Sequence, residues 1–210
     1  MPVHIHILNS CCDFRGHEAE IRTSIKGIAK ELSNILKITD LDIVVAHDPS
    51  QANHKIGIGG MAFNPKRLDI YFNMKNSNIS GNIKQYLRPI LGHELHHCAR
   101  MELVGMAKTL IDNLVMEGLA CQFEDVITGK NDSLLFKNIR KINWQKLYKT
   151  AIPHLNDIDF EFKYWFHGAS PKLLPKYAGY WVGYNLVLQY MAKNDKDWID
   201  LMNINASKFE

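Results

Sequence analysis

Residues 90–100, ILGHELHHCAR, contain the pattern H-E-x-x-H, which demands more of the local structure than any other feature of the chain. On an α-helix, residues i and i+4 lie about 40° apart around the axis and one turn apart along it. If this segment is helical, His93 and His97 can direct both imidazoles at one cation. Glu94 lies too far around the helix to chelate comfortably, but it can reach a water molecule held by that cation.

Zinc suits two neutral imidazoles and a carboxylate, and it lowers the pKa of its bound water towards ~7. Glu94 would take the proton of that water as general base and later deliver it to a leaving group. The third ligand is predicted on a second helix, where Glu117 interrupts an apolar stripe formed by Leu110, Leu114 and Cys121. A carboxylate there is costly unless it is paired or bound to metal. We therefore predict one Zn²⁺ held by His93, His97 and Glu117.

Each of these residues also has a simpler interpretation. His93 and His97 could form a satisfied pair without metal, and Glu117 could be a buried salt-bridge partner. His96 points about 100° away from His97 around the helix, which favours a structural role over metal binding. His4 and His6 share one face of a strand, but they lack an obvious third ligand and are interpreted as an exposed face.

Hydrophobic periodicity predicts an α+β fold. The strands are expected at residues 3–8, 41–46, 56–63 and 67–72, with a turn at residues 64–66 and an amphipathic helix at 18–36. The motif helix should start near Asn82 or at Pro89. Further helices are expected at about residues 107–126, 143–155, 157–166, 175–193 and 196–202. This order predicts a single domain, 1–210, in which a small mixed-sheet lobe (1–80) precedes a mostly helical lobe (81–210) that carries the metal site.

Composition excludes several classes of partner. The net charge of +3 is too small to imply a nucleic acid, and the basic run at residues 137–149 has the spacing of a solvated helix face. No stretch approaches the ~18 apolar residues that span a bilayer. The N-terminus MPVHIHILNSCC lacks the features of a secretory signal, and the four cysteines suit reduced thiols. We therefore expect a cytoplasmic protein; the sequence leaves its oligomeric state open.

The words HELHH and EGLA (residues 117–120) together resemble the gluzincin metallopeptidases, in which a glutamate on the following helix is the third zinc ligand. More closely, GIGGMAF, HELHH, EGLA and GYWVGY, between residues 56 and 184, resemble a bacterial family of predicted zinc-dependent proteases. The resemblance implies a zincin-like fold and peptidase activity. One position departs from it: thermolysin-like gluzincins often place an acid or hydroxyl residue where this chain has Cys121. Glu124, two turns after Glu117, could orient the ligand instead.

The resemblance also implies that GIGGMAF is an edge strand along which an extended substrate lies. Its Gly59, Gly60 and Met61 would then bind the peptide through backbone hydrogen bonds. The glycines could equally mark a bulge without function.

Hydrolysis of an amide also needs a donor for the developing oxyanion, worth ~3 kcal/mol. Tyr180 and Tyr184 lie one turn apart on one face of a predicted helix, and Gly179 and Gly183 would let that helix approach another backbone closely. This helix resembles that of thimet-type oligopeptidases, and His167 would match their upstream histidine donor. We favour the tyrosines over His167, although all three could be core or loop residues without a catalytic role.

The sequence thus predicts a zinc metallopeptidase acting on a peptide or protein. Two alternatives stay open. A zinc amidohydrolase of the deformylase kind would need Cys12 or Cys121 in place of Glu117. A metal-stabilised module that binds peptides without cutting them would have no need of Glu94 as a base.

Overall fold

The computed structural model describes residues 3–10, 13–129, 133, 135–168 and 173–210. The chain forms two compact units, Met1–Glu102 and Leu103–Glu210. The first contains the sheet together with the HELHH segment, and the second is helical. None of the helices in the described part of the chain combines the length and apolarity needed to cross a membrane. That the two units make up one domain stays a prediction.

A mixed sheet of four strands, in the order β1-β2-β4-β3, forms the framework of the first unit. The parallel strands are β1 (Val3–Ile7), β2 (Leu41–His47) and β4 (Arg67–Phe72). Strand β3 (Ile58–Asn64) pairs antiparallel with β4 and has a free outer edge in this sheet. The predicted mixed sheet and its turn between β3 and β4 are confirmed, with strand ends shifted by one or two residues.

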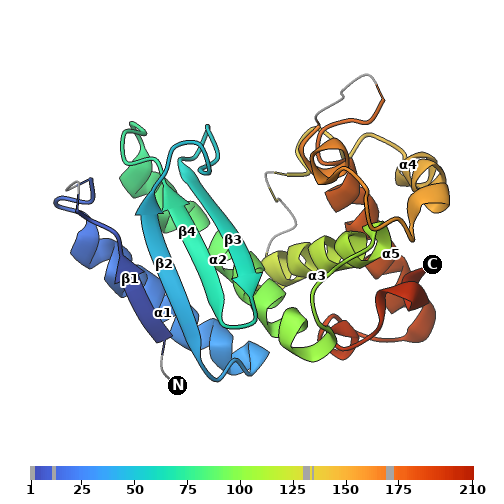
Figure 1. Ribbon diagram of the computed structural model, residues 1–210, viewed down its shortest axis with the longest axis horizontal. Helices are drawn as coiled ribbons and strands as arrows, with labels where there is room; N and C mark the ends of the chain where they lie inside the picture. The colour runs from blue at the N-terminus through green and yellow to red at the C-terminus, as the bar shows by residue number, and fades with distance from the viewer. Residues whose placement is uncertain (1–2, 11–12, 130–132, 134, 169–172) are drawn as a thin grey trace. The chain divides into compact units, whose positions relative to one another are not determined.

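One face of the sheet is apolar and the other polar. Ile43 and Ile70 are fully buried on the first face, whereas His6 on the second is exposed. Figure 1 shows α1 (Glu18–Leu36) and α2 (Ile79–Val104) on the same side of the sheet. Burying the apolar sides of strands and helices against each other forms the core of this unit. Helix α1 has the bounds that its apolar spacing predicts.

Helix α2 starts earlier than its sequence suggests. It begins at Ile79, so Pro89 lies inside the helix instead of in its first turn, and the predicted start at Pro89 is wrong. Proline lacks an N–H and so removes one hydrogen bond from a helix interior. From Leu91 to Met101 every residue is buried, and this packing holds the segment helical around the proline.

The second unit contains α3 (Leu110–Thr128), α4 (Trp144–Ala151) and α5 (Ala178–Asn194). A capping box between Thr109 and Asp112 fixes the start of α3. Two predicted helices are wrong. Residues 157–166 contain only the start of a π-helical turn, Lys163–His167, and residues 196–202 contain the single 3-10 turn Ile199–Leu201. Both segments are rich in aromatic residues or aspartates, whose tertiary contacts outweigh their weak helical spacing.

Glycines bring α3 and α5 close together. A Cβ added to Gly183 would lie 1.9 Å from the carbonyl oxygen of Leu114, and one added to Gly118 would lie 2.3 Å from the carbonyl oxygen of Gly183. The predicted close approach of the glycine helix to another backbone is therefore confirmed at Gly183. Gly179 faces a side chain instead, the ring of Phe166. The tight crossing fixes the part of α3 that carries Glu117.

Candidate metal centre

Helix α2 presents His93, Glu94 and His97 from one buried stretch. Their side chains are 8–9 % exposed. The two imidazole centroids lie 4.5 Å apart with their planes nearly perpendicular, and the i, i+4 spacing accounts for their proximity. The predicted helical motif is therefore present, with both rings on the same face.

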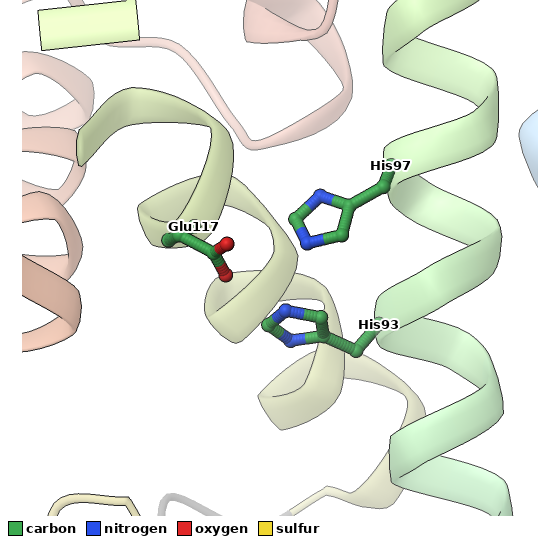
Figure 2. A group of neighbouring side chains, drawn as sticks. All are labelled: His93, His97 and Glu117. Atoms are coloured by element: carbon green, nitrogen blue, oxygen red, sulfur yellow. The ribbon is translucent and has the colours of Figure 1, made fainter. Parts of the chain in front are cut away.

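Glu117 lies in the middle of α3, inside the buried stretch Leu114–Phe123. One nitrogen from each of His93 and His97 and one carboxylate oxygen of Glu117 all lie within 4.8 Å of one another. Figure 2 shows the two rings and the carboxylate pointing toward one another. Two imidazole nitrogens and one carboxylate oxygen are a donor set that zinc prefers, so the residues present fit this metal.

A second group of three donors shares His93 and adds Cys121 and Glu124 from α3. This group bears on the one departure from the gluzincin pattern. It makes Glu124 a candidate for orienting His93, and it gives the alternative with a cysteine ligand a specific residue, Cys121. The other cysteine of that alternative, Cys12, lies outside the described residues.

The thiol of Cys98 lies one turn after Glu94 on α2. Burial, assisted by the negative charge of Glu94, raises the pKa of Cys98 to about 12. A thiol with this pKa is protonated at neutral pH and is therefore a poor nucleophile. Cys98 and Cys121 are both free and buried.

His96 and Arg100 form a separate buried pair of positions on α2. His96 is fully buried, Arg100 is nearly so, and neither belongs to a group of three metal donors among the described residues. The burial of Arg100 could not be predicted from the sequence. A position one helical turn after the motif can be either buried or exposed.

Tyr184 is part of the core of the second unit. Its hydroxyl donates a hydrogen bond of 2.7 Å to Asp125, and its ring stacks on Trp181. Burial, with the Asp125 carboxylate adding to it, raises the pKa of Tyr184 well above the usual range. Sequence reasoning missed Asp125, because no local pattern links it to a tyrosine 59 residues further along the chain.

Tyr180 packs against the π-helical turn that His167 ends. The ring of Tyr180 meets Phe166 edge-on at 5.2 Å, and His167 ends the π-helical turn that contains Phe166. Burial lowers the pKa of His167, and the negative charge of Glu117 opposes that shift. His167 therefore lies within electrostatic reach of the predicted zinc ligand.

The two central glycines of β3 face different neighbours. A Cβ on Gly59 would lie 2.5 Å from the carbonyl oxygen of Gln51, whereas a Cβ on Gly60 would meet the side chain of Glu94. Met61 is 45 % exposed. The predicted edge position of this strand is confirmed, and the role of these three residues in substrate binding stays a prediction.

The histidines of β1 each contact an aspartate. His6 contacts Asp42 at 2.7 Å and His4 contacts Asp40 at 3.4 Å, and all four side chains are more than half exposed. Within the described ranges no group of three metal donors includes them. This agrees with the interpretation of β1 as an exposed strand face.

A helix with H-E-x-x-H and a nearby buried carboxylate provide the donors typical of zinc-dependent hydrolases. The chain belongs to the family described as "Predicted Zn-dependent protease (DUF2268)", which matches residues 21–210. No curated protein and no solved structure matches it. The predicted membership of a zinc protease family is confirmed, and the gluzincin type and zincin-like fold stay predictions.

Proposed function

We propose that this protein is a zinc peptidase of gluzincin type, with a single zinc ion held by His93, His97 and Glu117. The proximity of these three buried donors is the observation that carries the proposal. The family description supports a zinc-dependent protease in general. When bound, zinc supplies a Lewis acid that polarises the scissile carbonyl and acidifies water.

Glu94 is the residue proposed to move the proton. Glu94 directly follows His93 and comes three residues before His97, so it lies on a different strip of the helix surface from the two imidazoles. From that position it accepts a proton from the attacking water and passes it to the leaving amine. A module that only bound peptides would have no use for a buried carboxylate at this position.

The substrate is proposed to lie extended along β3. Asn73 donates its backbone N–H to the carbonyl of Gly57, and alternation along the antiparallel pair then turns the N–H and C=O of Gly60 away from β4. These groups are available to a peptide that adds a strand at the edge. Gly59 and Met61 flank this pairing point, with their side-chain positions on the opposite face of the strand.

For the oxyanion, the contacts now favour His167. The Tyr184 hydroxyl donates to Asp125, whereas a neutral imidazole at residue 167 carries one N–H donor and feels the charge of Glu117. Tyr180 packs against the same turn and is the second candidate. Glu124 is proposed to orient His93.

The test is metal analysis of purified variants alongside peptide turnover. Glu117→Ala should abolish stoichiometric zinc binding, and Glu94→Gln should keep zinc and lose turnover. Glu102→Gln is the matched control for Glu94, because Glu102 lies on the same helix but is exposed and pairs with Lys66. Full zinc retention in Glu117→Ala, combined with zinc loss in Cys121→Ala, would favour an amidohydrolase with a cysteine ligand. Binding of peptides without cleavage by the wild type would favour the binding module.

A further inference from the structure

Gly60 lies against the side chain of Glu94. A Cβ built on Gly60 would be 2.5 Å from Cγ of Glu94, 2.9 Å from Oε1 and 3.0 Å from Cδ. Real Cβ atoms essentially never approach another heavy atom this closely, so any side chain at residue 60 would compete with Glu94 for the same space. Both residues belong to the first unit; Glu94 is buried and Gly60 is partly buried.

The direction of this contact follows from the geometry of the strand. Successive side chains on a strand alternate between the two faces, so residue 60 faces α2 while residues 59 and 61 face the other way. Its backbone N–H and C=O point sideways in the plane of the sheet, toward the free edge. At Gly60 the strand therefore presents its backbone polar groups to the open edge and a bare α-carbon to the side chain of Glu94.

What would give way on substitution depends on the neighbour. At Gly59 the obstacle is the backbone of Gln51, which cannot move without moving its loop. At Gly60 all three nearest atoms belong to one rotatable side chain. A methyl group at residue 60 would therefore force Glu94 into another rotamer, and the carboxylate would leave its present position.

We infer that Gly60 is a positioning residue, whose missing side chain provides the space that holds the Glu94 carboxylate next to the edge where a peptide binds. This role goes beyond backbone pairing with substrate and rests on the proposed function of Glu94 as a base. The φ angle of Gly60 is not in the left-handed region, so the backbone conformation alone does not require glycine here. The space that Glu94 occupies does.

The experiment compares Gly60→Ala with the wild type, alone and in the Glu94→Gln background. Gly60→Ala should keep one zinc per chain and lose kcat by about 10²-fold, because a displacement of about 1 Å in a reacting group has an effect of this size. The change in KM should be smaller. In the Glu94→Gln background, where the base is already absent, Gly60→Ala should cause little further loss. Gly27→Ala in α1, where a Cβ meets nothing within 4 Å, is the control for adding a methyl group.

A crystal structure of zinc-loaded Gly60→Ala gives a readout that does not depend on activity. We expect the Glu94 carboxylate to be displaced while His93 and His97 stay in place. An unmoved Glu94, or an equal loss of kcat in both backgrounds, would overturn the inference. If the wild type binds zinc but cleaves no peptide, the proposed function fails, and the position of Glu94 in the two structures still decides the role of Gly60.

Discussion

The glycines of β3 and those of the α3–α5 crossing make room for different things. Gly60 adjoins the side chain of Glu94, and Gly183 adjoins the carbonyl oxygen of Leu114. In both places an added Cβ would lie well inside the 3.0 Å within which real Cβ atoms are essentially never found, at 2.5 Å for Gly60 and 1.9 Å for Gly183. The two sites differ only in whether the neighbour can rotate away.

This difference separates activity from stability. A side chain that is displaced changes rotamer and takes its functional group with it, while the fold persists. A backbone that is displaced must carry its helix along, and the packing of the core is lost with it. Methyl groups added at the two places should therefore give opposite results in assays of turnover and of unfolding.

Gly183→Ala should have the largest effect on stability. A contact of 1.9 Å with Leu114 forces α3 and α5 apart, which we expect to cost about 3 kcal/mol of the free energy of unfolding. Denaturation in guanidinium, followed by circular dichroism, measures this cost. A variant as stable as the wild type would show that the crossing yields easily, and the contrast with Gly60 would disappear.

Gly118→Ala tests whether one added methyl group can lower both the stability of the fold and the affinity for zinc. Its Cβ would lie 2.3 Å from the carbonyl oxygen of Gly183, and it follows Glu117 directly in the chain. We expect a loss of about 2 kcal/mol in stability together with weaker zinc binding, because the proposed ligand Glu117 moves with the helix. Titration with a competing chelator measures the affinity. A stability loss at full zinc affinity would separate the crossing from the metal centre.

Tyr184→Phe should have an intermediate effect. It removes a hydroxyl that donates to the Asp125 carboxylate but leaves the stacked ring in place. Hydrogen bonds to charged groups contribute about 1.5–3 kcal/mol, and the partly exposed Asp125 regains some of this from water, so about 1 kcal/mol is expected. Urea denaturation measures the change. A loss above that of Gly183→Ala would contradict the ranking.

Gly27→Ala should have the smallest effect and the opposite sign. Gly27 lies inside α1 with open space around it, so alanine only reduces the conformational freedom of the unfolded chain. We expect a gain of about 0.5–1 kcal/mol. Thermal unfolding measures it, and a destabilised variant would show that open space around a glycine does not identify tolerant positions.

The parts of the site that depend on local spacing could be predicted from the sequence. His93, Glu94 and His97 lie within two helical turns, and the bounds of α1 follow from one apolar stripe. Glu117 could also be found, because it interrupts the apolar face of its own helix. Each of these signals comes from residues that are neighbours on a single element.

Contacts between elements could not be predicted in the same way. The bond from Tyr184 to Asp125 and the contact of Gly60 with Glu94 depend on packing between segments 59 and 34 residues apart in the chain. Of the two predicted starts of α2, the one at Pro89 is wrong because a local rule about proline is outweighed by burial of the segment that follows it. Packing of this kind leaves no periodic trace in the sequence.

The buried thiol of Cys98 can serve as a chemical probe for the opening of α2. With a pKa of about 12 and a fully buried sulfur, it reacts with iodoacetamide only when the first unit opens. The rate of alkylation at this residue, read by mass spectrometry, therefore reports transient opening next to Glu94, the proposed general base. Comparing that rate with and without zinc would measure how strongly the metal closes the helix that carries it.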